Sequence, residues 1–332
     1  MRVLITGGAG FLGRRLTAAL LREGVLAVDG GAPQPIEQIT LFDAVPAADR
    51  PDDRIEMVTG DITDRGVLDR LTAGADLVWH LAAVVSAAAE ADFDLGYRVN
   101  VDGTRLLLEA MRATGRRSRI VFASSLAVYG GDMPAVITDD FHPTPRTSYG
   151  THKAIGELLV ADHSRKGYVD GRSLRLPTIV VRSGTPNKAA STFASSIIRE
   201  PLAGRETVCP VPPDTAVYIL SPRQVTAALL RAMLLPERSW PVSRTVLLPG
   251  ITVSVADMVT ALARAAGTDA ADRISWQPDP DIQRIVDGWP VRAEARHARG
   301  LGFTDDGSFD EILRAFIDDD LGGTIPAQPN GH

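Results

Sequence analysis

The sequence has little that could form covalent or metal cross-links. Its 332 residues include one cysteine, Cys209, and six histidines. A single cysteine cannot form an intramolecular disulfide or a multi-cysteine zinc site. The histidines, at positions 80, 142, 152, 163, 297 and 332, do not have the spacing of metal ligands. We therefore expect no bound metal and a chain suited to a reducing compartment.

Long apolar runs and concentrated charge are also lacking. No stretch approaches the ~20 apolar residues needed to span a membrane. The apolar run that follows Met1 is too short for a signal-peptide core and leads directly into glycines. The 35 basic and 41 acidic residues are scattered and give a net charge of −6. These features predict neither a membrane nor a nucleic-acid partner, and they favour a cytoplasmic location.

The order of the apolar segments predicts alternating strands and helices. Strands are expected at 3–6, 39–42, 55–58, 77–81, 120–123 and 173–180, and helical patterns include 14–22, 148–165, 222–234 and 255–266. Residues 24–38, rich in glycine and proline, predict a loop. Apolar strands separated by helices indicate a parallel sheet covered on both faces. The predicted fold class is α/β, a doubly wound parallel sheet (Rossmann) with a smaller C-terminal region.

A glycine motif connects the first expected strand to its helix. Gly7, Gly10 and Gly13 form G-x-x-G-x-x-G, where bare backbone and the amides of the helix N-terminus can receive a pyrophosphate. Asp43, at the end of the second strand, can accept hydrogen bonds from both ribose hydroxyls and would repel a 2′-phosphate, so NAD is favoured over NADP. Asp61 could hold the adenine amine or cap the helix that follows it.

Tyr149 and Lys153 stand four residues apart on an expected helix, so their side chains share a face. An adjacent ammonium favours the tyrosine phenolate, which predicts Tyr149 as a general base. Ser124 and Ser125 end an apolar strand, where one hydroxyl can hold a substrate oxygen. The G-x-S-x-G elbow of serine hydrolases is absent from the sequence.

Together, the segment Gly7 to Gly13, the sequence His80-Leu81-Ala82-Ala83, Asn100, Ser125 and the Tyr149 to Lys153 pair resemble the extended short-chain dehydrogenase/reductases, the NAD-dependent epimerase/dehydratase family. The resemblance implies an NAD-dependent enzyme. It implies Tyr149 as the acid/base, Lys153 as its activator and a ligand of the nicotinamide ribose, and Ser125 as the group that orients the substrate.

The resemblance and the motifs together give two sets of expected binding residues. The expected cofactor-binding residues are Gly7, Gly10, Phe11, Leu12, Gly13, Asp43, Asp61, Ile62, Leu81, Ala82, Ala83, Asn100, Ser124, Tyr149, Lys153, Pro177, Thr178 and Ile179. The expected substrate-binding residues are Ser86, Ser125, Tyr149, Arg182, Asn187 and Lys188.

The segment after the sixth expected strand bears on the substrate. Thr178 stands where sugar-nucleotide epimerases carry the asparagine of an N-x-Y-G-P pattern, and no Y-G-P follows. Residues 175–199, the loop at 30–35 and the segment 300–303 are similar to those of D-erythronate dehydrogenases. This similarity implies oxidation of the C2 hydroxyl of a small sugar acid, with hydride transfer to NAD. Arg182, Asn187 and Lys188 are then candidate ligands of the substrate carboxylate.

Two other functions stay open. A nucleotide-sugar epimerase, dehydratase or decarboxylase with tightly bound NAD would begin with the same half-reaction but return the hydride, so NADH release separates the two classes. A redox-sensing NAD-binding regulator would not need the catalytic pair, and Tyr149 and Lys153 are both present.

The chain is expected to divide into a cofactor part and a substrate part. Residues 1–182, with a contribution from about 215–250, form the expected NAD-binding domain. Residues 183–214 and 251–322 form the expected substrate-binding region, and 323–332 a flexible tail. The family resemblance also implies a homodimer that pairs the segments 99–113 and 149–165.

Overall fold

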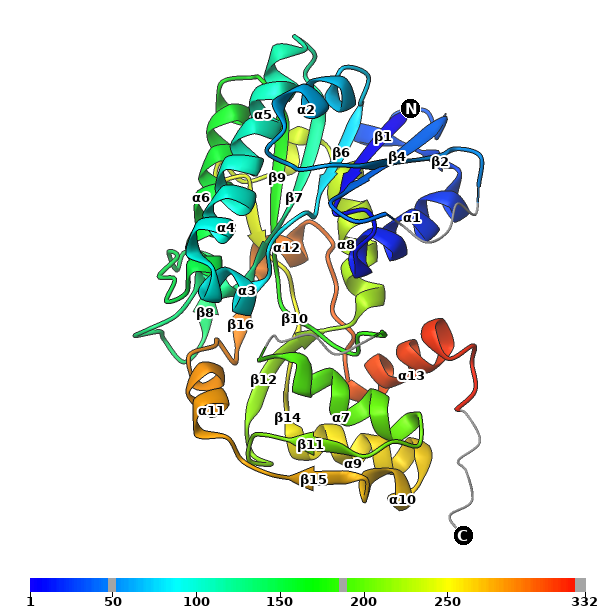
Figure 1. Ribbon diagram of the computed structural model, residues 1–332, viewed down its shortest axis with the longest axis vertical. Helices are drawn as coiled ribbons and strands as arrows, with labels where there is room; N and C mark the ends of the chain where they lie inside the picture. The colour runs from blue at the N-terminus through cyan, green and yellow to red at the C-terminus, as the bar shows by residue number, and fades with distance from the viewer. Residues whose placement is uncertain (47–51, 185–189, 326–332) are drawn as a thin grey trace.

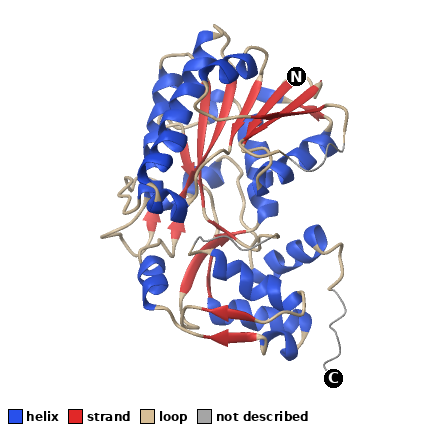
Figure 2. Ribbon diagram, in the orientation of Figure 1, coloured by secondary structure: helices blue, strands red, loops and turns tan. Residues whose placement is uncertain are grey.

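The computed structural model describes residues 1–46, 52–184 and 190–325. A sheet of seven parallel strands forms its centre, in the order β13-β9-β7-β6-β1-β4-β5 (Figures 1 and 2). The strands are β1 (Arg2–Thr6), β4 (Gln38–Asp43), β5 (Ile55–Thr59), β6 (Leu77–His80), β7 (Arg119–Ser125), β9 (Asp170–Leu176) and β13 (Thr245–Leu247). The strand order reverses between β1 and β6, which places a ligand crevice at the carboxyl ends of these strands. The predicted doubly wound Rossmann sheet is confirmed.

Alternate residues of each strand enter different hydrophobic cores. Val3 and Ile5 of β1 are buried on one face with α1 (Phe11–Glu23) and α8 (Pro222–Leu234), whereas Leu4 is buried on the other. The second face is covered by α2 (Arg65–Thr72), α5 (Gly103–Ala113) and α6 (Ser148–Arg165), seen to the left of the sheet in Figure 1. Because both faces are covered, the strands carry buried apolar residues on both of their sides.

The prediction of one strand over 173–180 was wrong. Strand β9 ends at Leu176, before Pro177, which has no backbone N–H to donate to a ladder. The chain then leaves the large sheet as β10 (Thr178–Ile179) and pairs with β12 (Ala216–Leu220), which pairs antiparallel with β14 (Ile251–Ser254). The predicted loop at 24–38 holds a short antiparallel pair, β2 (Val25–Leu26) and β3 (Gln34–Pro35).

A second hydrophobic core lies around the β10-β12-β14 sheet, below the large sheet in Figure 1. Its buried residues include Phe193, Ile197, Met258, Leu262 and Phe316. The elements that carry this core are α7 (Thr192–Leu202), β11 (Thr207–Cys209), α9 (Val255–Ala266), α10 (Thr268–Ala271), β15 (Ile274–Trp276), α11 (Pro280–Asp287) and α13 (Phe309–Asp320).

Shorter elements complete the fold. They are α3 (Ser86–Ala91), α4 (Phe93–Tyr97), a π-helical turn (Arg98–Asp102), the parallel pair β8 (Ile137–Thr138) and β16 (Ala293–Glu294), α12 (Arg296–Gly300) and three single 3₁₀ turns (Val28–Gly30, Leu126–Val128 and Glu237–Ser239). Within the described residues, every helix is too short or too polar to cross a bilayer.

Candidate active site

The glycine loop between β1 and α1 forms a tight backbone cradle. Gly7 has a φ of +72°, and a Cβ there would lie 2.7 Å from the amide nitrogen of Ala82. A Cβ on Gly13 would lie 2.4 Å from the carbonyl oxygen of Gly7. Gly10 is the exposed N-cap of α1 and supplies no side-chain cap, so the first amides of α1 are available to a ligand at the loop. This cradle fits the pyrophosphate of a dinucleotide.

Asp43 lies at the carboxyl end of β4, directly beside the cradle. One carboxylate oxygen accepts a 3.0 Å hydrogen bond from the Ala9 amide, and the other accepts a 3.3 Å hydrogen bond from the Val45 amide. These bonds fix the carboxylate at the edge of the glycine loop, where the adenosine ribose of a bound dinucleotide would extend.

Asp61 does not cap the helix that follows it, which corrects one of the two sequence predictions for this residue. Its carboxylate accepts hydrogen bonds from the amide and the hydroxyl of Thr63, which lower its pKa. The cap of α2 is Asp64, which accepts a hydrogen bond from the Val67 amide. The side chain of Ile62 is buried in the core under α5, so a contact with a cofactor would use its backbone.

The segment after β6 is held by Asn100. The Asn100 side chain accepts a 2.8 Å hydrogen bond from the Val84 amide and donates a 2.9 Å hydrogen bond to the Val84 carbonyl. Leu81, Ala82 and Ala83 are partly buried in this segment, and Ser86 follows as the first residue of α3. Asn100 therefore acts on the crevice by shaping the backbone between β6 and α3.

His80 has no free nitrogen for a ligand. Both ring nitrogens form hydrogen bonds: Nδ1 with the Thr6 hydroxyl, at 2.7 Å, and Nε2 with the Thr104 hydroxyl, at 2.9 Å. Burial lowers the pKa of His80 to about 3, and the charge of Lys153 contributes to this shift. Within the described ranges, no group of three or more His, Cys, Asp or Glu side chains is arranged to hold a metal.

Ser125, Tyr149 and Lys153 meet at the carboxyl end of β7. Helix α6 begins after Thr147, whose hydroxyl caps the Gly150 amide, so Tyr149 and Lys153 lie in its first turns. Lys153 is buried, and its Nζ donates a 2.7 Å hydrogen bond to the carbonyl oxygen of Ala123. The Ser125 hydroxyl accepts a 3.1 Å hydrogen bond from the Ala127 amide and also interacts with the Tyr149 hydroxyl.

The electrostatics of this pair differ from the sequence prediction. Desolvation raises the pKa of Tyr149 to about 12, and the contributions that oppose this rise come from the Ser125 hydrogen bond and the charge of Arg182. Burial lowers the pKa of Lys153 to about 7. Desolvation of both side chains thus outweighs the effect expected from their sequence spacing alone.

Arg182 comes to Tyr149 from the far side of the crevice. It follows β10, and one guanidinium nitrogen lies 3.4 Å from the Ser191 hydroxyl. The Arg182 amide donates to Ser195 Oγ, and Arg199 donates to the Arg182 carbonyl, so α7 fixes its backbone. Arg182 has no carboxylate partner in the described part of the chain. The other two expected carboxylate ligands, Asn187 and Lys188, lie outside the described residues.

Pro177, Thr178 and Ile179 carry the chain from β9 into β10, between the large sheet and the second core. Pro177 is buried, and Thr178 and Ile179 are partly exposed. These residues border the same crevice as Tyr149, since β9 lies next to β7 in the sheet and ends at the same edge.

Sequence reasoning missed two residues behind the site. Glu157 forms a bidentate ion pair with Arg175, with distances of 2.9 and 2.7 Å, and accepts a 2.5 Å hydrogen bond from the Ser124 hydroxyl. A contact between Ser124 and a cofactor would therefore use its backbone. The sequence did contain a signal for Glu157. Tyr149, Lys153 and Glu157 recur every four residues and are therefore expected on one face of the helix.

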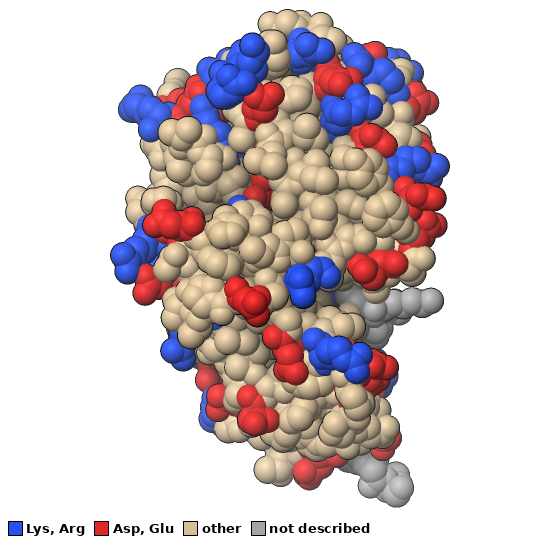
Figure 3. All heavy atoms as spheres, turned by 90° about the vertical axis from the view of Figure 1, so that its left-hand side faces the viewer, with Lys and Arg blue, Asp and Glu red and all other residues tan. Residues whose placement is uncertain are grey.

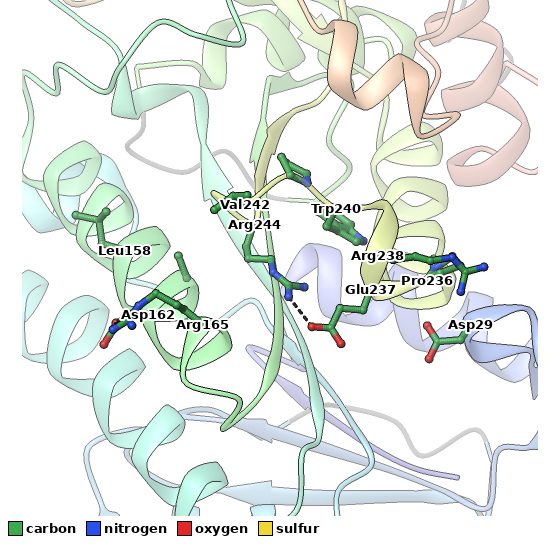
Figure 4. A pocket seen from close by; sticks show the side chains of 12 residues that line it. Asp29, Leu158, Asp162, Arg165, Pro236, Glu237, Arg238, Trp240, Val242 and Arg244 are labelled. Carbon is green, nitrogen blue, oxygen red and sulfur yellow. Dashed lines mark hydrogen bonds and ion pairs between the residues drawn. The ribbon is translucent and has the colours of Figure 1, made fainter.

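A separate pocket lies at the opposite edge of the sheet, where β7, β9 and β13 begin (Figure 4). Arg244 and Glu237 form an ion pair in its wall. Hydrogen bonds from Arg117 and Arg244 lower the pKa of Glu237 to about 2. The pocket lies at the amino ends of these strands, so it is distinct from the crevice at Tyr149.

Comparison with known proteins shows similarity over nearly the whole chain. Residues 3–217 match the model of the NAD dependent epimerase/dehydratase family. The chain is 51% identical over 320 residues to D-erythronate dehydrogenase from Cupriavidus necator, which covers 96% of this chain and 98% of that protein. It is 42% identical over 326 residues to D-erythronate dehydrogenase from Haemophilus influenzae, with 97% and 100% covered.

A solved structure with the same fold is named as a different kind of enzyme. The crystal structure of a nucleoside-diphosphate-sugar epimerase from Agrobacterium tumefaciens matches with a TM-score of 0.93 at 42% identity, covering 98% of this chain and 96% of that one. The names of similar proteins thus divide between a dehydrogenase and an epimerase, and the residues of the crevice have to separate the two.

Proposed function

Because the chain belongs to the NAD dependent epimerase/dehydratase family, we propose that it is a D-erythronate dehydrogenase. It is a dehydrogenase of the extended short-chain dehydrogenase/reductase type and uses a nicotinamide cofactor. In the proposed reaction the C2 hydroxyl of D-erythronate is oxidised to the 2-keto acid. NAD, bound along the glycine loop, would supply the hydride acceptor.

Arg182 is the observation that carries the choice of substrate. It is a partly buried guanidinium beside Tyr149 that has no acidic partner in the described ranges. A desolvated charge of this kind is stabilised by an anion, and a carboxylate matches the two parallel N–H groups of arginine. In a small sugar acid, the carbon that carries the C2 hydroxyl is bonded directly to the carboxylate. A carboxylate held by Arg182 would therefore place this hydroxyl near the hydroxyls of Ser125 and Tyr149.

The catalytic steps follow from the three side chains at the end of β7. Ser125 holds the substrate C2 oxygen beside Tyr149. Tyr149 accepts the hydroxyl proton as the C2 hydrogen leaves with its electron pair. The positive charge of Lys153 favours the Tyr149 phenolate, and its ammonium would also bind the nicotinamide ribose. We assign to the cofactor the backbone of the glycine loop, the segment 81–83 and the segment 177–179.

NAD is the proposed cofactor rather than NADP because of Asp43. Its carboxylate is already fixed by the Ala9 and Val45 amides, so it cannot turn away from a 2′-phosphate without losing those bonds. A fixed negative charge at this position accepts ribose hydroxyls and repels a phosphate.

A nucleotide-sugar epimerase is the second candidate, and the likeness to the Agrobacterium tumefaciens structure favours it. Such an enzyme must neutralise a diphosphate. The asparagine that anchors the diphosphate in the family pattern is replaced here by Thr178, which lies in β10. Arg182, which has no acidic partner within the described residues, suits one carboxylate better than two phosphates.

The deciding experiment measures NADH release from purified enzyme with NAD and D-erythronate. We expect one NADH per keto acid formed, and much lower kcat/KM with the matching four-carbon polyol, which lacks the carboxylate. UDP- and dTDP-sugars serve as the competing substrates. Conversion of a nucleotide sugar without net NADH, together with no reaction of C4 to C6 aldonic acids, would establish the epimerase instead.

We further propose a cytoplasmic homodimer in which one part of each chain binds NAD and the other binds substrate. The face formed by α4, α5 and α6 is largely uncharged at its centre (Figure 3). It exposes Phe93, Tyr97 and Leu158, with exposed fractions of 61%, 42% and 71%. Burial of these apolar side chains in an interface favours association with a second copy of the chain. Light scattering should show a dimer for the wild type and a monomer for Leu158→Glu.

A further inference from the structure

Three side chains of α6 face the end of strand β7 in succession. Tyr149, Lys153 and Glu157 recur at four-residue intervals and therefore lie along one face of the helix. Each reaches a different residue of the strand end. Tyr149 interacts with Ser125, Lys153 donates to the Ala123 carbonyl, and Glu157 accepts from the Ser124 hydroxyl.

Glu157 is held more rigidly than an ordinary helical carboxylate. Its side chain is 5% exposed, and both of its oxygens accept hydrogen bonds from Arg175, whose side chain is 11% exposed. The third nitrogen of Arg175 donates to the Tyr129 hydroxyl at 2.5 Å, and the guanidinium lies 5.0 Å from the centre of the Tyr129 ring. The negative charge of Glu157 is therefore fixed in position inside the protein.

Lys153 lacks such compensation in its immediate surroundings. Its Nζ donates to a neutral carbonyl and lies 4.8 Å from the centre of the Phe122 ring. The titratable groups around it are Tyr149, His152 and Glu157 on α6 and His80 on β6. Among these groups, Glu157 is the one that carries a carboxylate. A buried ammonium is costly unless a negative charge lies near it.

We propose that Glu157 is a positioning residue for the catalytic pair, because its fixed negative charge, one helical turn from Lys153, stabilises the Lys153 ammonium at the Ala123 carbonyl. Arg175 and Tyr129 support this role by preventing the carboxylate from turning away. The burial that lowers the pKa of Lys153 to about 7 is opposed by the charge of Glu157, in agreement with this geometry.

A purely structural role makes a different prediction. If Glu157 served only to neutralise Arg175, its replacement would lower stability but leave the titration of Lys153 unchanged. If it acts on Lys153, loss of the charge makes the ammonium lose its proton at lower pH. The active form of the pair, with Tyr149 deprotonated and Lys153 protonated, would then give way to the inactive form in which the proton stays on Tyr149.

This consequence for activity rests on the proposed function, whereas the titration of Lys153 does not. The chain contains only three lysines, Lys153, Lys166 and Lys188. Protein labelled with ¹³C-lysine therefore gives three side-chain signals, and Lys153 is assigned from the Lys166→Arg and Lys188→Arg variants. The pKa of Lys153 can then be read directly by NMR, with no cofactor or substrate present.

The test compares wild type, Glu157→Gln and Asp162→Asn. Glutamine keeps the hydrogen-bond acceptor for Ser124 but removes the charge. Asp162, five residues further along α6, pairs with Arg165 at the surface and is the matched control. We expect Glu157→Gln to move the Lys153 titration to lower pH by about one unit and Asp162→Asn to leave it in place. An unchanged titration in Glu157→Gln overturns the proposal.

A second variant covers the case in which Glu157→Gln does not fold, since it leaves Arg175 as a buried unpaired charge. The double variant Glu157→Gln, Arg175→Met removes both charges, so the Lys153 titration should still move to lower pH but by less than in Glu157→Gln, because Arg175 no longer opposes the ammonium; no movement in the double variant together with none in Glu157→Gln overturns the proposal. In parallel, kcat should fall about 10-fold in Glu157→Gln with the Kd of NAD unchanged. If Tyr149→Phe retains activity, the proposed chemistry fails, yet the titration still decides the role of Glu157.

Discussion

Lys153 donates a hydrogen bond from Nζ to the carbonyl oxygen of Ala123, two residues before Ser125, at 2.7 Å. This bond joins the first turns of α6 to the end of β7. It fixes the distance between the helix that carries Tyr149 and the strand that carries Ser125. The two hydroxyls meet because a buried ammonium is anchored between their elements, so changes at Lys153 are expected to affect both binding and chemistry.

The first prediction concerns the proton acceptor. Tyr149→Phe keeps the ring but removes the hydroxyl, so kcat should fall by at least ~10²-fold while the Kd of NAD changes little. Lys153→Met should lower kcat and weaken NAD binding together, because Lys153 is expected to serve both. Steady-state kinetics and a fluorescence titration of NAD measure these effects. Near-normal turnover by the phenylalanine variant would remove Tyr149 from the mechanism.

Cofactor choice is the subject of the second prediction. Asp43→Ala should weaken NAD binding and relax the rejection of NADP, because the carboxylate that accepts the ribose hydroxyls and repels a phosphate is lost. Titration of both cofactors against wild type and variant checks this. Asp64→Ala, which removes the cap of α2 and leaves Asp43 in place, is the control for a loss of stability. A wild type that prefers NADP contradicts the assignment.

The third prediction concerns recognition of the carboxylate. Arg182→Gln should raise the KM for D-erythronate roughly 10- to 100-fold, with NAD binding intact, because it removes a charge-assisted pair of hydrogen bonds. The polyol, which has no carboxylate, should be insensitive to the change. Arg205→Gln, at an exposed arginine that pairs with Glu200, is the matched control. Equal effects on acid and polyol would rule out a carboxylate at Arg182.

The fourth prediction concerns stability and pH. His80 has a pKa of about 3 in the folded protein, whereas histidine in an unfolded chain titrates near ~6.5. Between these values the unfolded chain binds a proton that the folded protein excludes. The free energy of unfolding should therefore decrease as pH falls below about 6.5, by up to about 1.4 kcal/mol per pH unit from this residue.

His80→Gln should flatten this dependence, although it lowers stability at pH 7.5. Urea unfolding at pH 7.5, 6.5 and 5.5 measures the slope, and His142→Gln, at an exposed histidine, is the control. The same slope in wild type and His80→Gln would show that His80 does not bind its proton differently in the two states.

Helices with strong end signals could be predicted from sequence with the bounds that the structure gives. Helix α8 begins at Pro222 after the cap Ser221, α9 follows the cap Ser254, and α6 follows the cap Thr147. The break at Pro177 was missed because the apolar run continues through it, and hydrophobicity alone does not show where a strand changes sheets. The partner strand β12 lies about forty residues further along the chain.

The candidate site was predictable where its residues share a local pattern. Tyr149 and Lys153 share a helix face, and the glycine loop is a continuous motif. The contact of Glu157 with Arg175 was not predictable, because the two residues lie on different elements and meet only when β9 pairs with β7. Likewise, the pKa values of Tyr149 and Lys153 depend on burial, which spacing does not report.

The path of the chain between its two hydrophobic cores limits how this protein can be divided or recombined. After β10 enters the second core, α8 returns to cover one face of the large sheet, and β13 completes that sheet before β14 leads back. A fragment that stopped at residue 182 would expose the apolar surface that α8 covers. The segments of the second core are thus insertions in a single folding unit, and a graft from a relative would have to replace them separately while keeping Leu229 and Val246 in place.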